Sequence, residues 1–190
     1  SPPPLYSAAA LLSGGDYQAI DVSKDGTNIV VGIKNSHLMY STDGGASFAD
    51  ASGPSSEDWF SVAACGDTGT FYAVAHLGGI WKSTDKGASF TEIDSTDRYN
   101  TGLDCSADAT KVVLVLATTS YPLMSTDSGA SFNEVTSVGT GQWTDACIDD
   151  SSSYTAVFLK AGSIVLYTGS DYTTHNPSQF NGYRECAISS

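Results

Sequence analysis

Basic residues are scarce in this sequence. Lys and Arg number only 8 in 190 residues, against 21 Asp and Glu, which gives a formal net charge of −13. Because nucleic acids and anionic membrane surfaces are bound through clustered Lys and Arg, this balance argues against both as partners. No apolar run approaches the roughly 18 residues of a membrane helix. The sequence therefore predicts no nucleic-acid binding and no membrane insertion.

Metal-binding residues are also poorly represented. The chain has three His and no Cys-x-x-Cys pair, so a zinc site has little support. One loop, Asp149-Asp150 followed by Ser151 to Ser153, is rich in the oxygen donors that calcium prefers. Since acidic turns are more often simply solvated, we predict no cofactor and keep calcium at this loop as the alternative.

The composition is that of a folded extracellular protein. Hydrophobic residues make up 41% of the chain and charged residues only 15%, whereas disordered chains usually show the opposite balance. Ser, Thr, Gly and Tyr are abundant. The four cysteines allow two disulfides in three pairings, or buried thiols in strands. They are Cys65, Cys105, Cys147 and Cys186. We expect an extracellular or secreted location.

An octapeptide recurs three times. Ser41-Thr42-Asp43-Gly44-Gly45-Ala46-Ser47-Phe48 returns in nearly identical form at 83–90 and at 125–132, each copy beginning 42 residues after the one before. Three strand-like runs precede each copy, and a short fourth run follows it. No stretch has a convincing helical period. Four strands in about 42 residues is the pattern of one β-propeller blade.

The predicted fold is therefore all-β, a β-propeller of four-stranded antiparallel blades in a single domain over 1–190. The repeats cover about 16–56, 57–97, 98–140 and 141–181. In the second repeat we expect separate strands at 60–64, 71–75, 79–82 and 90–93. The fourth repeat has no octapeptide Asp, since Gly169 stands where it is due and Asp171 is displaced by two residues.

The ends of the chain leave the closure of the propeller open. Residues 182–190 resemble an extra inner strand, and Leu5-Tyr6-Ser7 resembles the end of a third strand. These ends allow a four-bladed ring with an extra strand, a five-bladed ring with a hybrid blade, or an open arc completed by another chain or by sequence not present here. An open arc would expose apolar blade faces and unpaired strand edges, and it should associate.

The octapeptide has a structural explanation. An Asp side chain accepts hydrogen bonds from the backbone of its turn, and Ser bonds locally in the same way. Gly suits a backbone angle that a Cβ disfavours, and Phe buries its ring between sheets. The residues with these roles are Ser41, Asp43, Gly45, Phe48, Ser83, Asp85, Gly87, Phe90, Ser125, Asp127, Gly129 and Phe132.

The pattern Ser-x-Asp-x-Gly-x-x-Phe resembles the Asp-box, or BNR repeat, of sialidase-like β-propellers. The resemblance covers about residues 16–137 and implies a structural motif on the turn between the third and fourth strands of each blade. Sialidases of this family bind the substrate carboxylate with three arginines, whereas this chain has only Arg98 and Arg184. We therefore predict no sialidase activity.

Other glycosidases need two carboxylates roughly 5–9 Å apart. Several acids lie on or beside the first strands, which line the channel of a propeller, and Asp21, Asp104 and Asp145 are placed to face it together. The remaining acids of this kind are Glu57, Asp58 and Glu185. Most such residues are solvated channel groups, so this is the weaker interpretation.

An aromatic residue opens each blade. Trp59, Tyr99, Trp143 and Tyr183 form by repetition a ring on one face, with Tyr17 at the first repeat. Such residues either stack on sugars and partner proteins or wedge neighbouring blades together, and we favour the wedge.

The hypothesis that follows is a non-enzymatic, extracellular propeller acting as a structural or adhesive interaction module, as one subunit of an assembly or filament. Its partners would be other protein chains or copies of itself. The alternative is a carbohydrate-binding or glycoside-hydrolysing propeller that uses the channel-side acids. A third class, an assembly chaperone like the photosystem II assembly-factor propellers, is disfavoured because those proteins are larger and carry basic patches.

Overall fold

The computed structural model describes residues 15–54, 56–148, 155–159 and 163–175. These residues are almost entirely strands and turns, with a single 3-10 turn at Thr136–Val138. None of the described segments is a helix long and apolar enough to cross a membrane. Each four-stranded repeat is called a blade below.

The first and last blades are separate antiparallel sheets with their strands in chain order. Blade 1 consists of β1 (Tyr17–Val22), β2 (Ile29–Ile33), β3 (Leu38–Ser41) and β4 (Ala49–Asp50). Blade 4 consists of β11 (Trp143–Ile148), β12 (Thr155–Leu159), β13 (Ile164–Tyr167) and β14 (Tyr172–His175).

The two middle blades share one six-stranded sheet, in the order β10-β9-β8-β7-β6-β5. Its strands are β5 (Trp59–Ala64), β6 (Phe71–Ser83), β7 (Thr91–Cys105), β8 (Val112–Leu116), β9 (Leu123–Ser125) and β10 (Asn133–Glu134). Blade 2 contains β5, β6 and the first residues of β7. Blade 3 begins with the last residues of β7, its inner strand, and continues through β8 to β10.

The prediction of separate second and third strands in the second repeat was wrong. β6 runs continuously through 71–83, because His76 pairs with Tyr99 and Gly78 pairs with Arg98, which extends the ladder past the expected turn. The same pairing joins the outer strand of blade 2 to the inner strand of blade 3 as the single strand β7. The repeat boundary expected at 97/98 therefore lies inside a strand.

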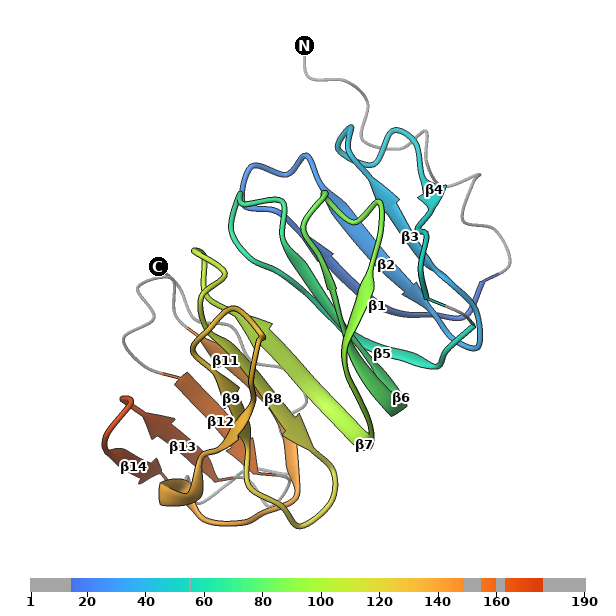
Figure 1. Cartoon of the computed structure of the whole chain (residues 1–190). Coiled ribbons are helices and arrows are strands. Elements are labelled where there is room, and N and C mark those ends of the chain that lie inside the picture. The colour runs from blue at the N-terminus through green and yellow to red at the C-terminus, as the bar shows by residue number, and fades with distance from the viewer. Residues whose placement is uncertain (1–14, 55, 149–154, 160–162, 176–190) are drawn as a thin grey trace.

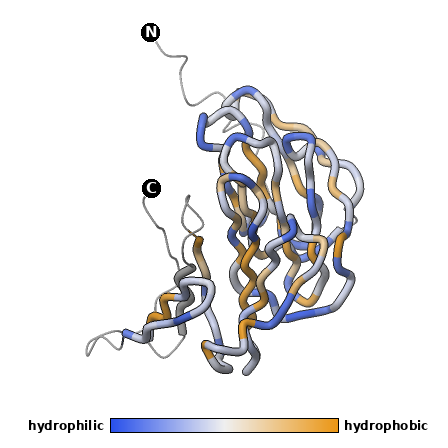
Figure 2. The backbone as a smooth tube through the Cα atoms, turned by 60° about the vertical axis from the view of Figure 1, so that its left-hand side comes forward, coloured by the Kyte–Doolittle hydropathy of each residue, from blue (hydrophilic) through white to orange (hydrophobic). Residues whose placement is uncertain are grey.

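The hydrophobic cores lie between neighbouring blades. Successive side chains of a strand point to opposite faces; in β6, for example, Phe71 and Ala73 pack toward blade 1, whereas Tyr72 and Val74 pack toward blade 3. A third core joins blades 3 and 4 around Trp143. Figure 2 shows the hydrophobic residues along the strands and the hydrophilic ones mostly in the turns. Burial on both faces explains why the second strands of blades 2 and 3 are continuous apolar runs.

The blades follow one another as an arc (Figure 1). The inner strands pack in the sequence β1, β5, β7, β11. The described residues show no comparable packing of β1 against β11, and the extra inner strand expected at 182–190 lies outside them.

Every inner strand carries a β-bulge, at the second residue of β1, β5 and β11 and at Thr101 within β7, and these bulges fix the alignment of the blades. The registers break at Gln18, Phe60, Thr101 and Thr144. Counted from these bulges, Asp21, Ala63, Asp104 and Cys147 hold one equivalent position. This alignment is used below to compare equivalent residues.

Candidate functional site

The three octapeptide turns have the same hydrogen-bond pattern. The Ser41 hydroxyl donates to Asp43 Oδ1 over 2.7 Å and accepts from the Gly45 N–H over 2.9 Å. Asp43 in turn accepts from the Ser47 N–H at 2.9 Å and from the Ser47 hydroxyl at 2.6 Å. Equivalent bonds close the turns of blades 2 and 3. These bonds are local, so each Asp holds its own turn.

The glycine of each turn has a left-handed backbone, with φ of 84° at Gly45, 88° at Gly87 and 82° at Gly129. The turns of blades 2 and 3 also press against the preceding blade. A Cβ on Gly87 would lie 2.5 Å from Val30 Cγ2, and one on Gly129 would lie 2.9 Å from Ile93 Cδ1. The turn therefore needs glycine both for its conformation and for close packing between blades.

The aromatic residue of the octapeptide differs in burial among the blades. Phe90 is buried in the core between blades 1 and 2, whereas Phe48 and Phe132 are half-buried. In blade 4 the octapeptide is replaced by a tight hairpin, in which the Thr168 N–H donates to the Asp171 carbonyl over 2.9 Å and Gly169 has φ 90°.

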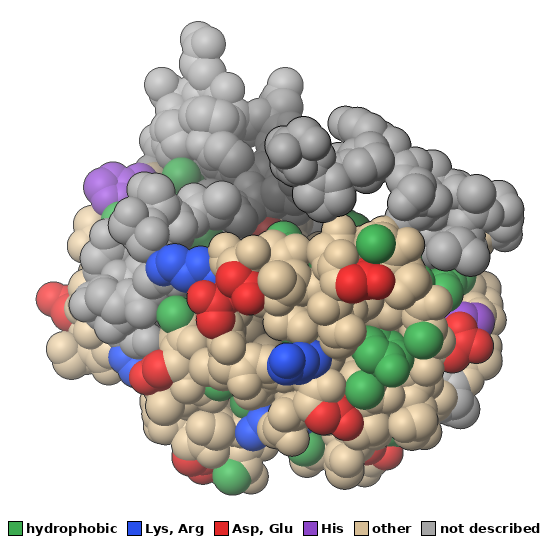
Figure 3. All heavy atoms as spheres, turned by 90° about the horizontal axis from the view of Figure 1, so that it is seen from above, with side chains coloured by type: hydrophobic (Ala, Val, Ile, Leu, Met, Phe, Trp, Pro, Cys, Tyr) green, Lys and Arg blue, Asp and Glu red, His purple; other side chains and the backbone are tan. Residues whose placement is uncertain are grey.

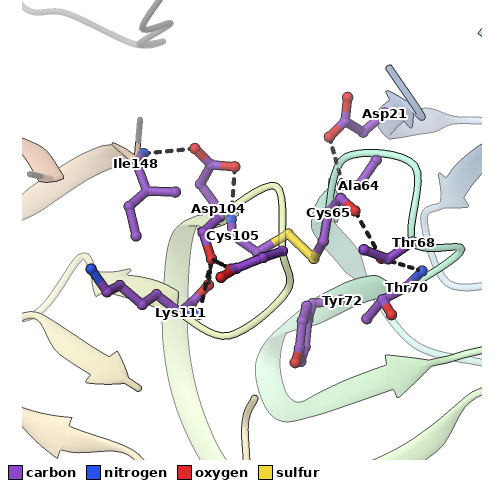
Figure 4. Close-up of a disulfide and its surroundings, with 12 residues drawn as sticks. Asp21, Ala64, Cys65, Thr68, Thr70, Tyr72, Asp104, Cys105, Lys111 and Ile148 are labelled. Carbon is purple, nitrogen blue, oxygen red and sulfur yellow. Dashed lines mark hydrogen bonds between the residues drawn. A yellow bond between two sulfur atoms is a disulfide. The ribbon is translucent and has the colours of Figure 1, made fainter. Parts of the chain in front are cut away.

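The inner strands are linked in series near their ends, as Figure 4 shows. Asp21 Oδ2 of blade 1 accepts from the Ala64 N–H of blade 2 over 2.7 Å. Asp104 Oδ2 of blade 3 accepts from the Ile148 N–H of blade 4 over 2.8 Å. Blade 2 has Ala63 at the equivalent position, and there the Cys65–Cys105 disulfide joins blades 2 and 3 instead.

The four cysteines were candidates for disulfides with the pairing open. Cys65 bonds to Cys105, with 5.5 Å between their Cα atoms. Cys147 is also disulfide-bonded, and Cys186 lies outside the described residues. None of the described cysteines is free. The sequence did not predict that Asp21 and Asp104 link neighbouring blades. Their equivalent positions in repeats one and three could have indicated this shared role.

The channel-side acids do lie close enough to interact electrostatically. Burial raises the pKa of Asp104 to about 7 against the opposing effect of its backbone hydrogen bonds, and the charges of Asp21 and Asp145 act in the same direction as burial. Burial also raises the pKa of Asp21. Both Asp104 oxygens, however, accept backbone N–H groups, from Cys105 and Ile148. This arrangement suits a carboxyl that holds blades together more than one that delivers a proton to a substrate.

The described residues form no cluster of the kind that holds a metal ion. No group of three or more His, Cys, Asp or Glu among them is arranged to hold a metal ion. His37 contacts Asp50 at 2.9 Å, and His175 lies on the exposed strand β14. The calcium alternative at 149–153, Glu185 and Arg184 lie outside the described residues.

Among the described residues, the aromatic side chains that open the blades do not form a ring on one exposed face. Trp59 and Trp143 are completely buried, so they are no ligand face. Their indole N–H groups donate to backbone carbonyls of the preceding blade, Trp59 to Ser36 over 2.9 Å and Trp143 to Ser120 over 2.8 Å. They wedge adjacent blades together. Tyr99 is 47% exposed, and Tyr183 lies outside the described residues.

An exposed apolar cluster lies around Tyr99. The His76 ring lies between Phe60 and Tyr99, with ring centroids 5.8 Å and 5.5 Å away. Phe60, Leu77 and Tyr99 are exposed. The four residues Phe60, His76, Leu77 and Tyr99 are called the aromatic patch below.

On the face seen in Figure 3, single Lys and Arg side chains alternate with acidic and polar ones. The described residues of this face form no basic cluster. This agrees with the excess of acidic residues in the sequence. The face offers no surface of the kind that binds phosphate backbones.

Comparison with solved structures shows the fold. The chain resembles a GH74 enzyme of Niastella koreensis (24% identity, 83% of this chain, TM-score 0.65) and YCF48 from Cyanidioschyzon merolae (12% identity, 87% of this chain, TM-score 0.65). It also resembles a chain of a nidogen/laminin complex (8% identity, 87% of this chain, TM-score 0.69). These neighbours are propeller proteins, so the fold is of the β-propeller type.

The chain spans only part of these proteins, 24% of the GH74 enzyme, 57% of YCF48 and 66% of the nidogen/laminin chain. No protein-family model matches the chain, and no curated protein sequence matches it. The likeness therefore concerns the fold and carries no activity.

Proposed function

We propose that this chain is a non-enzymatic, extracellular propeller module of the Asp-box type that binds other protein chains through the open face of blade 1. The observation that carries the proposal is the exposure of Ile20. Its side chain on β1 is 69% exposed, whereas the equivalent Val62, Leu103 and Ala146 are all buried by a preceding blade.

The neighbouring position follows the same rule. Val22 is 46% exposed, whereas its equivalents Cys105 and Ile148 are buried and Ala64 is partly buried. We call Ile20 and Val22 the open face. Removing one such aliphatic side chain from water is worth roughly 1.5–3 kcal/mol. The most economical occupant is another propeller blade, because a preceding blade buries the position equivalent to Ile20 in each of the other three blades. A second copy of the chain would supply such a blade if it packed the face of its blade 4 that points away from blade 3 against Ile20 and Val22.

Two further features support the proposal. The octapeptide geometry is explained by local turn closure and blade packing, which leaves it no catalytic task. Disulfides persist in oxidising compartments, so the Cys65–Cys105 bond favours an extracellular or secreted location. The similar YCF48 has been solved bound to a D1 peptide, which sets a precedent for protein binding on this type of fold.

The test is the mass of the chain in solution, measured by light scattering on a sizing column over a range of concentrations. We expect concentration-dependent association that Ile20→Asp weakens by about tenfold or more, since a buried charge without a partner is costly. Leu77→Asn, on a different surface, serves as the control and should associate like the wild type. A wild-type chain that stays monomeric at all concentrations would refute self-association through the open face.

Glycoside hydrolysis is the second candidate, and the raised pKa of Asp104, about 7, is the observation that favours it. A general acid needs a proton at neutral pH. A panel of soluble polysaccharides assayed for new reducing ends would decide the matter. We expect no turnover; turnover that Asp104→Asn abolishes while the variant remains folded would replace the first proposal.

A further inference from the structure

The aromatic patch departs from the repeat at three positions, each time toward an exposed apolar side chain. Phe60 occupies the bulge position that Gln18, Thr101 and Thr144 hold in the other blades. Tyr99 lies inside β7, two residues before the bulge, where blades 1, 2 and 4 have Asp16, Asp58 and Gln142. Since the other blades fold with polar residues there, folding does not require the apolar ones.

The third departure, Leu77, also costs conformational energy. Its backbone lies in the left-handed region, with φ 58°, and its side chain is 50% exposed. The equivalent residue of blade 1 is Asn35, with φ 52°. Asn tolerates this region, whereas a bulky apolar residue is an outlier there. Such strain is concentrated at functional sites.

Buried polar atoms without a hydrogen-bond partner gather at the same corner of blade 2. Of the five such side-chain atoms among the described residues, four lie here: Asp58 Oδ1, His76 Nδ1, Arg98 Nη1 and Asn100 Oδ1. Their residues are connected through the patch. The backbone N–H of His76 donates to the Asp58 carbonyl over 2.7 Å, and the side-chain amide of Asn100 donates to the carbonyls of Ala75 and Gly78. Natural proteins rarely leave such atoms unpaired without a reason.

The charge around the patch is negative. Asp58 lies two residues before Phe60, and Asp97 is exposed one residue before Arg98. The positive charge of Arg98 is compensated within the protein, because its Nη2 contacts Asp94 Oδ2 at 2.9 Å. The rim therefore complements a cation, as does the net charge of −13.

We propose that the aromatic patch is a docking surface for a segment of a partner protein that presents Lys or Arg beside apolar side chains. The apolar side chains would pack on Phe60, Leu77 and Tyr99, as aromatic anchors do in protein interfaces. A cation would interact with the Tyr99 ring and the acidic rim. The surface consists of residues other than those of the open face, so it goes beyond self-association and can be tested separately.

The test uses three fluorescein-labelled peptides of equal length, alternating Lys with Leu, Glu with Leu, and Lys with Gly. Fluorescence anisotropy measures their binding to the full chain at low and moderate salt. We expect the Lys–Leu peptide to bind at least about tenfold more tightly than the other two, because it alone matches both the apolar patch and the acidic rim. We expect Tyr99→Ala to weaken this binding about tenfold or more.

Two variants guard against a loss of fold. Phe60→Thr and Leu77→Asn introduce residues that other blades carry at the equivalent positions, so they should fold and still lose binding. Tyr172→Ala is the matched control, because Tyr172 is a similarly exposed tyrosine, 45%, on β14 of blade 4.

The outcomes separate the proposal from simple charge attraction. Equal binding of the Lys–Leu and Lys–Gly peptides, or binding that Phe60→Thr, Leu77→Asn and Tyr99→Ala leave unchanged, would overturn it. Absence of binding by the Lys–Leu peptide would overturn it as well. The mass of these variants in solution should equal that of the wild type, so a failure here leaves the open face of blade 1 unaffected.

Discussion

Single hydroxyl groups organise the three octapeptide turns. Ser41, Ser83 and Ser125 each connect the carboxylate of their turn with the N–H of its glycine, and all three are buried. The carboxylates themselves remain exposed at the surface. The residue that most needs its hydrogen bonds is therefore the serine, because without its hydroxyl the glycine N–H of the turn would be left unpaired, in blades 2 and 3 away from water.

Ser83→Ala tests this at blade 2. The substitution leaves the Gly87 N–H without its acceptor at 3.0 Å and removes the donor to Asp85. We expect the free energy of unfolding, from urea titration, to fall by about 1–2 kcal/mol. Thr84→Ala changes the exposed neighbour and should alter it by less than about 0.5 kcal/mol. Equal effects of the two would contradict the assignment.

Leu77→Asn tests the strain in the aromatic patch. Because Asn suits a φ of 58° better than Leu, and because the side chain is exposed, we expect the melting temperature to rise, by an amount corresponding to roughly 0.5–1 kcal/mol. Asn35→Leu at the equivalent position of blade 1 should lower it. If Leu77→Asn lowers the melting temperature, the leucine packs favourably within the chain. Backbone strain would then no longer support the docking surface.

At the scale of elements, the repeats predicted most of the strands, since alternating or continuous apolar runs between turn residues report burial directly. They failed at β6 and β7, because the ladder from His76 to Arg98 depends on pairing between segments far apart in the sequence. For the aromatic residues that open the blades, the sequence favoured a wedge between blades but left a ligand face open. Whether Trp59 faces a ligand or the preceding blade is decided by the Ser36 carbonyl on that blade, which no local pattern reveals.

Two hydrogen bonds and a disulfide link the inner strands and hold neighbouring blades side by side. The Cys65–Cys105 disulfide closes a sequence separation of 40 residues, for which the loss of chain entropy in the unfolded state corresponds to about 4 kcal/mol. We expect the double variant Cys65→Ala/Cys105→Ala to lose stability of this order in urea unfolding. Thr68→Ala, in the turn that follows Cys65, controls for local disturbance. A loss below about 1 kcal/mol would show that packing alone holds blades 2 and 3 together.

At the scale of the whole molecule, the acids whose pKa is displaced form two groups with opposite shifts. Hydrogen bonds from Ser47 and Ser131 hold the pKa values of Asp43 and Asp127 at about 2, chiefly through the serine hydroxyls. Burial moves the other group upward, with Asp104 at about 7 and Asp21 raised in the same direction. The surface turns therefore favour the ionised carboxylate, and the linked inner strands favour the neutral acid.

These shifts predict a maximum of stability near pH 4. Below it, the native state must protonate carboxylates of low pKa, so the stability that they contribute is lost as the pH falls from about 4 toward 2. Above it, the native state keeps on Asp104 a proton that the unfolded chain has released. The free energy of unfolding therefore falls as the pH rises from about 4 to 7 and levels off beyond.

Urea titrations from pH 2 to 8 would measure this, and Asp104→Asn should flatten the decline between pH 4 and 7, whatever it does to the absolute stability. The exposed Asp97→Asn should keep the wild-type slope. A stability that rises steadily from pH 4 to 8 would contradict the raised pKa and leave Asp104 as an ordinary ionised link between blades 3 and 4.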